Sequence, residues 1–186
     1  MIQKIDPQAN PWTVLSSKIS HENPWFKVRE HEVIRPDGNP GGYYVVETRY
    51  ATGVVALTPQ QEIYLVGQYR FPTKEYSWEI VEGGSDPQES PLHAAQRELK
   101  EEAGLIAKRW TPLGGELHLS NCISSERGYL FLAEDLVETE TSPDPTEVLQ
   151  LRKLPLKDCL ALVESGEIKD TLSVIAILRL ARALKL

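Results

Sequence analysis

The sequence has little cysteine and no excess of positive charge. Only Cys122 and Cys159 occur among its 186 residues, far apart and without a CxxC or Cys/His ligand spacing. A zinc site or a disulfide framework is therefore not expected, and both cysteines are predicted to be free thiols. Lysine and arginine number 20 against 27 acidic residues, for a net charge of −7. This balance argues against a general nucleic-acid binder, which normally shows a basic face.

Long hydrophobic runs are also missing. The N-terminal residues MIQKIDPQANPW contain no apolar core of the kind that a signal peptide needs. The longest apolar stretch, residues 171–186, is interrupted by Arg179 and Arg182 and is too short to span a bilayer. We expect it to be a docking helix of a cytoplasmic protein that has no membrane partner.

The pattern of apolar residues predicts a β-rich core flanked by helices. A helix is expected to begin at Ser90, a good N-cap followed by Pro91, and to end at Gly104. Two further helices are expected near 156–165 and 170–184. Strands are expected at 12–19, 25–35, 43–50, 53–58, 63–70, 77–82, 105–113, 128–136 and 148–154. Together these elements indicate an α/β or α+β fold.

Three carboxylates are crowded onto the first predicted helix. Glu98, Glu101 and Glu102 stand at i, i+3 and i+4, so they project from one face. They lie near the C-terminal end of the helix, where the macrodipole disfavours negative charge, and apolar residues including Leu92 and Leu99 face the other way. The spacing leaves two interpretations open: a solvated acidic face, or a site for Mg²⁺, which prefers carboxylates and waters.

The segment GGSDPQESPLHAAQRELKEEAGL, residues 83–105, resembles the Nudix box, GX5EX7REUXEEXGU, in which U is a bulky apolar residue. Every fixed position of the motif is filled in register, by Gly83, Glu89, Arg97, Glu98, Leu99, Glu101, Glu102, Gly104 and Leu105. The resemblance implies hydrolysis of a nucleoside diphosphate linked to another group, with Mg²⁺ or Mn²⁺. It also implies an α/β/α sandwich with a mixed sheet over residues 49–186, preceded by an antiparallel β-strand module, residues 1–48, that serves dimerisation or substrate binding.

Roles for the acidic residues follow from the same resemblance. Glu98 and Glu102 look like direct metal ligands, and Glu101 would join them or bind a second ion. The main-chain carbonyl of Glu82, just before the box, would add a further ligand. Such ions neutralise a pyrophosphate, activate a water and hold the bridging oxygens in line.

Supporting roles are implied for residues within and before the box. Arg97 and Glu89 look like an ion pair that fixes the loop against the helix, next to Gly83. The stretches VGQYRFP, 66–72, and WEIVEGG, 78–84, resemble the branch of ADP-ribose pyrophosphatases and nucleoside-diphosphate-sugar hydrolases. In that branch Arg70 would contact phosphate or a metal-binding carboxylate, and Glu79 would lie at the rim of the active site. The alternatives are a surface arginine and a cross-strand pair.

The aromatic residues near the N-terminus have three possible roles. Trp25 and its neighbour Phe26, and the pair Tyr43 and Tyr44, would stack on a base, pack a dimer or fill the core, and core packing is the default. Related enzymes often form homodimers in which N-terminal strands complete the partner's site. A homodimer is therefore expected, with Trp25 as a candidate substrate contact.

The choice of substrate depends on one departure from the family pattern. ADP-ribose pyrophosphatases typically carry Ser-Pro-Gly a short way past the box, where this chain has Ser120-Asn121-Cys122. The missing proline favours a nucleoside diphosphate sugar, cleaved to a nucleoside monophosphate and a sugar 1-phosphate, over ADP-ribose as the alternative. A nucleotide-binding regulator without activity and a nucleoside triphosphatase rank below both.

The general base is expected on the polar loop 137–147, before the last predicted strand. Glu147 is the first choice because it directly precedes that strand, and Glu140 and Asp144 are the alternatives. A mobile loop can bring such a group within hydrogen-bond reach of a water.

Overall fold

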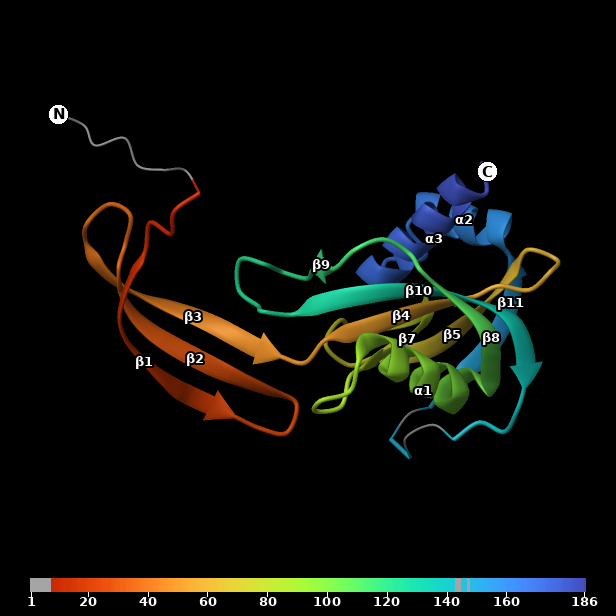
Figure 1. The fold of residues 1–186 in the computed structure, drawn as a ribbon, viewed down its shortest axis with the longest axis horizontal. Coiled ribbons are helices and arrows are strands. Elements are labelled where there is room, and N and C mark those ends of the chain that lie inside the picture. Colours follow the sequence, from red (N-terminus) through yellow and green to blue (C-terminus); the bar gives the residue numbers. More distant parts are fainter. Residues whose placement is uncertain (1–7, 143–144, 147) are drawn as a thin grey trace. The chain divides into compact units, whose positions relative to one another are not determined.

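The candidate catalytic carboxylates lie in the larger of two units. The computed structural model describes residues 8–142, 145–146 and 148–186. The first unit consists of the described residues up to Thr48 together with Leu119–Glu126, and the second of Arg49–His118 and Arg127–Leu186. The ribbon is shown along the chain in Figure 1.

The first unit is built on a three-stranded antiparallel sheet in the order β1-β2-β3. Its strands are β1 (Thr13–Glu22), β2 (Phe26–Ile34) and β3 (Pro40–Thr48). The segment 119–126 joins β3 through hydrogen bonds from Val46 N to Ile123 O, 2.8 Å, and from Ser125 N to Val46 O, 3.0 Å.

Core packing of the N-terminal aromatics, the default expectation, is wrong for Trp25 and Tyr44. Their exposed fractions are 76% and 54%, and every residue of β1 is exposed. Among the described residues of this unit no helix covers the sheet, so a single chain has too little material there to bury both faces.

The second unit contains a mixed sheet and a smaller antiparallel one. The mixed sheet has the order β7-β4-β10-β8, in which β4 and β10 run parallel and the other pairs are antiparallel. Its strands are β7 (Val81–Gly84), β4 (Ala51–Ala56), β10 (Arg127–Glu138) and β8 (Leu105–Pro112), with the short β9 (Leu117–His118) on β10. The smaller sheet, β11-β5-β6, consists of β11 (Gln150–Pro155), β5 (Glu62–Arg70) and β6 (Glu75–Glu79).

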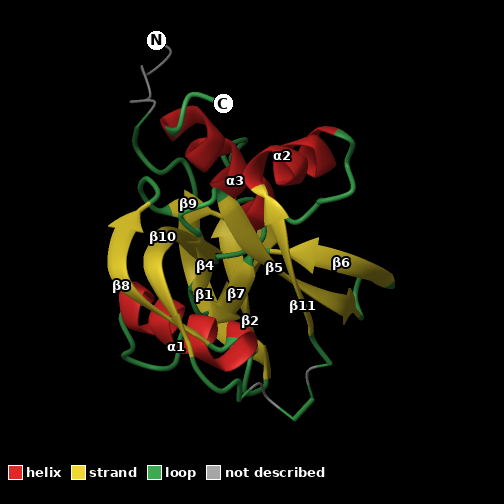
Figure 2. Ribbon diagram, turned by 90° about the vertical axis from the view of Figure 1, so that its right-hand side faces the viewer, coloured by secondary structure: helices red, strands yellow, loops and turns green. Residues whose placement is uncertain are grey.

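Helices cover both faces of the mixed sheet, as Figures 1 and 2 show. Helix α1 (Pro91–Ala103) packs against β7, β4 and β8, and α3 (Thr171–Ala183) packs against β4 and β10 beside α2 (Leu156–Glu164). The core between α1 and the sheet includes Val54, Val81, Leu99 and Leu105. The predicted α/β fold with a mixed sheet and antiparallel N-terminal strands is thereby confirmed. In the part of the chain that the structure describes, no helix has both the length and the apolarity to cross a membrane.

The strand predicted at 77–82 is in fact two strands. β6 pairs with β5 and β7 pairs with β4, and the chain changes sheets at Ile80. The main-chain N–H of Ile80 is taken by the Ser173 hydroxyl on α3, at 3.0 Å, instead of by a neighbouring strand. β7 then continues through Gly83 and Gly84, where the sequence predicted a break.

The predicted loop 137–147 begins later than expected. Val137 and Glu138 extend β10, because they pair with Ile106 and Leu105 of β8. Thr139, the first residue after β10, therefore lies directly beside the C-terminal end of α1, where its N–H donates to Gly104 O.

Candidate active site

Helix α1 has the ends that its sequence predicts. The Ser90 hydroxyl accepts a hydrogen bond from His93 N at 3.3 Å, and Pro91 occupies the first turn. Gly104 ends the helix in the left-handed conformation, with φ of 61°, and its N–H bonds the carbonyls of the last turn. These caps, together with the buried Leu99 and Ala95, fix the direction in which the carboxylates point.

The three carboxylates differ in burial, and two of them contact strand β7. Glu102 is 6% exposed and its Oε2 accepts a hydrogen bond from Glu82 N at 3.3 Å. The Glu98 side chain is 12% exposed and that of Glu101 36%. A purely solvated acidic face is therefore wrong for Glu98 and Glu102, which lie against the sheet.

Gly83 makes room for the Glu98 carboxyl group. A Cβ at position 83 would stand 2.0 Å from both Cδ and Oε1 of Glu98, far inside van der Waals contact. The strand is also held from the other side, since Thr52 Oγ1 donates to Gly83 O at 3.3 Å. Glycine is required at position 83 because the Glu98 carboxyl group packs directly against the backbone of β7.

Arg97 forms ion pairs with three of the carboxylates, those of Glu89, Glu98 and Glu101. Its Nη1 donates to Glu98 Oε1 at 2.7 Å and to Glu101 Oε2 at 3.0 Å. Its Nε and Nη2 bind the two oxygens of Glu89 at 3.2 and 3.0 Å, and Nη2 also donates to Gly84 O at 2.8 Å. The hydrogen bonds with Glu89 raise the pKa of Arg97, and the same bonds lower the pKa of Glu89. Arg97 and Glu89 thus form an ion pair that connects α1 with the preceding loop.

Behind β7 lies a buried polar cluster that the sequence did not predict. The Ser173 hydroxyl, fully buried, donates to Glu82 Oε1 at 2.8 Å, and Asp170 caps α3 by accepting from Ser173 N at 2.8 Å. Burial and the neighbouring Asp170 raise the pKa of Glu82 well above its usual range, which favours its protonated form. Ser173, a polar residue within the mostly apolar stretch 171–178, and Asp170 before it were the sequence signals for this cluster.

Arg70 and Glu79 form a bidentate ion pair across β5 and β6. Arg70 Nε lies 3.0 and 3.1 Å from the two Glu79 oxygens, and Nη2 also donates to Oε2. Glu79 is only 3% exposed, and hydrogen bonding to it raises the pKa of Arg70. Both residues line a cavity of about 380 Å³ with Asp170. The observed contact is the cross-strand pair that was the alternative for Glu79, and contact of Arg70 with phosphate or a metal-binding carboxylate stays a prediction.

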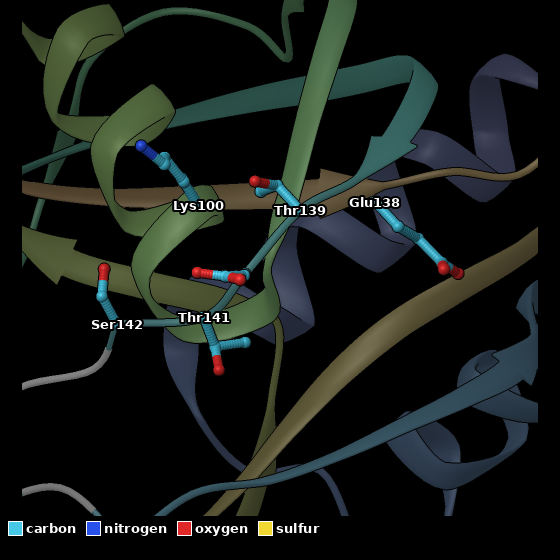
Figure 3. Close-up of a pocket in the computed structure, with 6 residues that line it drawn as sticks. Lys100, Glu138, Thr139, Thr141 and Ser142 are labelled. Carbon is cyan, nitrogen blue, oxygen red and sulfur yellow. The ribbon is translucent and has the colours of Figure 1, made fainter.

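The segment after β10 is tied to the C-terminal end of α1. Thr139 N donates to Gly104 O at 2.7 Å, and Ser142 N donates to Glu101 O at 3.0 Å. A cavity of about 610 Å³ lies there, and Figure 3 shows the side chains around it. Glu140 lines this cavity together with Lys100. The other two candidates for the general base, Glu147 and Asp144, lie outside the described residues.

The oxygen donors fit a hard divalent cation. Glu98 and Glu102 contact adjacent positions of β7, next to the main-chain carbonyl of Glu82, and Glu101 shares Arg97 with Glu98. Among the described residues no three His, Cys, Asp or Glu side chains enclose a metal site by themselves. Water and substrate oxygens would complete the coordination, as is usual for Mg²⁺. Of the predicted site residues, only Trp25 belongs to the first unit.

Two family models match the chain. The model described as NUDIX domain matches residues 47–172. The model described as nucleoside diphosphate sugar hydrolase N-terminal domain matches residues 12–46.

Several characterised proteins and a solved structure are similar along most of the chain. An ADP-ribose pyrophosphatase of Bacillus subtilis is 34% identical over 158 residues, covering 83% of this chain and 85% of that protein. A methanol dehydrogenase activator of Bacillus methanolicus is 31% identical over 163 residues, covering 86% and 88%. An ADP-ribose pyrophosphatase of Mycobacterium tuberculosis is 30% identical, covering 88% and 80%. The crystal structure of an ADP compounds hydrolase matches with a TM-score of 0.85 and 26% identity over 97% of both chains.

Proposed function

The chain belongs to the Nudix family, and we propose that it hydrolyses the pyrophosphate of a nucleoside diphosphate joined to a sugar, with Mg²⁺ or Mn²⁺ as the metal. The products are a nucleoside monophosphate and a sugar phosphate. The observation that carries this proposal is the packing of Glu98 and Glu102 against Gly83 and Glu82 of β7. That contact places the carboxylate oxygens of Glu98 and Glu102 side by side on the surface of β7, where a Nudix pyrophosphohydrolase needs ligands for its metal.

The residues of this surface divide the work. Glu98, Glu102 and the Glu82 carbonyl would hold the cation, with Glu101 beside them. When bound, the cation would supply positive charge for the pyrophosphate oxygens and would lower the pKa of a coordinated water. The ion pair between Arg97 and Glu89 fixes the loop against helix α1. The carboxylate oxygens of the site therefore need little rearrangement when substrate binds.

The general base remains a proposal that rests on the family resemblance. Glu147 is the first candidate, with Glu140 and Asp144 as alternatives. A Glu147→Gln variant is expected to lower kcat by orders of magnitude while leaving metal binding intact. Turnover near that of the wild type would remove Glu147 from the mechanism and direct attention to Glu140 and Asp144.

Two observations favour different members of the substrate class. Relatives named ADP-ribose pyrophosphatase favour ADP-ribose. The match of residues 12–46 to the nucleoside diphosphate sugar hydrolase model favours a wider set, and so does Ser120-Asn121-Cys122 in place of Ser-Pro-Gly. We propose activity on ADP-ribose and on other nucleoside diphosphate sugars, with Arg70, Glu79 and Trp25 as substrate-side residues of a cytoplasmic homodimer.

A hydrolysis panel tests the proposed function. ADP-ribose, ADP-glucose, GDP-mannose, UDP-glucose and dGTP are each incubated with enzyme and Mg²⁺, and mononucleotide release is measured. Chelation with EDTA should stop the reaction and added Mg²⁺ should restore it. Glu102→Gln should lower kcat by about a hundredfold or more, because a metal ligand is weakened. Glu164→Gln, the same chemical change at an exposed residue of α2, should leave kcat unchanged.

Each outcome of the panel has a definite meaning. Release from several sugars, lost in Glu102→Gln, supports a hydrolase of broad specificity. Release from ADP-ribose alone would show that Asn121 does not widen the specificity. Nucleotide binding without any release would replace the hydrolase with a regulator, and a preference for dGTP would indicate a triphosphatase.

A further inference from the structure

A third polar cavity, of about 380 Å³, lies in the second unit beside the connection between α2 and α3. It is lined by Tyr76 and Trp78 of β6, Arg152 of β11 and the segment Gly166–Lys169. Tyr76, Glu167 and Lys169 also line the cavity that contains Arg70 and Glu79, whereas Trp78 and Arg152 line this one alone. Its volume falls within the range of small-molecule sites in proteins.

Arg152 lines this cavity with one hydrogen-bond donor unsatisfied. Its Nε is buried and has no hydrogen-bond partner among the described residues. The neighbouring cations are paired, since Lys153 binds Glu62 at 3.2 Å and Arg70 binds Glu79. A buried donor that is left unsatisfied destabilises the folded protein. In a chain with 27 acidic residues, a partly buried arginine that none of the described carboxylates neutralises therefore suggests an external anion.

The guanidinium of Arg152 is held in a fixed plane by Trp78. Its Cζ lies 4.0 Å from the centroid of the Trp78 ring, within the range of a cation–π contact. Trp78 pairs with Gly67 in the sheet, and a Cβ at Gly67 would stand 2.7 Å from Cζ3 of the indole. The glycine lets the ring lie close to β5, and the ring in turn orients the guanidinium. The arginine is thus ordered before any ligand arrives.

We propose that this cavity binds the phosphate group of a phosphate monoester, with Arg152 as its anchor. A planar guanidinium presents paired N–H donors that match two phosphate oxygens, and stacking on an aromatic ring leaves those donors in the plane. Lys169 adds a second cation at the cavity, although it also binds Glu75 at 2.6 Å. Glu167 lines the same cavity, and the negative charge of its carboxylate would repel a bound anion, which limits the affinity.

Two sources supply this chemistry. One is free inorganic phosphate, and the other is a phosphate monoester such as a nucleoside monophosphate or a sugar phosphate. The second source rests on the proposed function, because these are the products of the proposed reaction. The test below is made without metal and without turnover, so its result does not depend on hydrolysis.

The experiment is a titration of metal-free protein, kept in EDTA, with inorganic phosphate, AMP and ribose 5-phosphate. The Nε–H resonance of Arg152 is followed in a ¹H–¹⁵N spectrum and is assigned as the arginine peak missing from Arg152→Lys. It is expected to shift saturably in the wild type. Calorimetry should show at least a tenfold loss of affinity in Arg152→Gln. Lys153→Gln removes the same charge at the next residue, outside the cavity, and should bind as the wild type does.

The outcomes separate the proposal from its alternatives. Tighter binding of AMP or ribose 5-phosphate than of phosphate identifies the ligand as an organic monoester, and equal binding identifies the bare phosphate group. Unchanged affinity in Arg152→Gln overturns the proposal, and so does an Arg152 Nε–H resonance that does not respond in the folded wild type. Arg152-dependent binding in a protein that hydrolyses nothing would preserve this inference and refute only the proposed function.

Discussion

At the scale of single residues, the site depends on the absence of a side chain at one position. Gly83 and Gly84 are adjacent in β7, and both precede α1. A Cβ at Gly83 would overlap the Glu98 carboxyl group at 2.0 Å, whereas a Cβ at Gly84 would meet no atom within 4 Å. Two neighbouring glycines of the same strand therefore differ completely in what a methyl group would do.

This difference gives a matched pair of variants. Gly83→Ala is expected to lower kcat/KM by at least about a hundredfold, because Glu98 must leave its place against β7 and a metal ligand is displaced. Gly84→Ala is expected to keep activity within about threefold of the wild type, since a surface change away from special features is worth only about 0.5 kcal/mol. Steady-state kinetics on the preferred substrate, with Mn²⁺ affinity by calorimetry, check both. Equal activity in the two variants would contradict the role given to Gly83.

The position of a residue could be predicted from the sequence where its contacts are with residues close to it along the chain. The places of Glu98, Glu101 and Glu102 on one helical face follow from local spacing, which a sequence displays directly. The contact of Ser173 with Glu82 joins residues 91 positions apart, and no local pattern encodes it. The burial of Glu102 was missed for the same reason, because the helix spacing does not reveal the strand that covers it.

At the scale of elements, the first turn of α3 supports β7 from behind. Ser173 donates to Glu82 and accepts from Ile80 N, so one hydroxyl holds the point where the chain passes from β6 to β7. Glu102 holds the same strand from the front through Glu82 N. The strand that carries the candidate metal-binding carbonyl is thereby clamped between α1 and α3.

Removing that hydroxyl should cost both stability and activity. Ser173→Ala leaves the buried Ile80 N–H without a partner and removes one hydrogen bond from the Glu82 carboxyl group, so the free energy of unfolding should fall by roughly 1–3 kcal/mol. The concentration of Mn²⁺ needed for half-maximal binding should rise, because the strand is less well fixed. Ser125→Ala, at an exposed serine of the first unit, is the control and should change neither quantity. Urea unfolding and calorimetry measure them, and a Ser173→Ala protein as stable as the control would refute the clamp.

Elements were predictable where their signals were local. The boundaries of α1 followed from Ser90, Pro91 and Gly104, each of which acts within one turn. The switch at Ile80 was not predictable, because residues 77–82, SWEIVE, contain no glycine or proline, and such a stretch looks the same whether a strand stays in one sheet or moves to the next. The extension of β10 to Glu138 was not predictable either. It depends on pairing with Ile106 and Leu105 of β8, which the sequence around residue 138 does not reveal.

At the scale of the whole molecule, the first unit has apolar surface that it does not bury itself. β1 lies at the edge of its sheet and is exposed along its full length. Val14, Leu15 and Ile19 on this strand are 52%, 59% and 43% exposed. An exposed edge strand with apolar side chains readily pairs or packs with another chain. These observations support the homodimer expected from the sequence, with β1 in its interface.

Light scattering coupled to size-exclusion chromatography tests the dimer. The wild type is expected at about twice the chain mass of 20.9 kDa. Leu15→Glu and Ile19→Glu place a charge in the interface and should shift the protein to the monomer, because burying an unpaired carboxylate costs several kcal/mol. Leu178→Glu, the same kind of change at a 45% exposed residue of the second unit, should remain dimeric. A wild type that elutes with the mass of one chain at all concentrations would refute the dimer and leave β1 a solvent-facing edge.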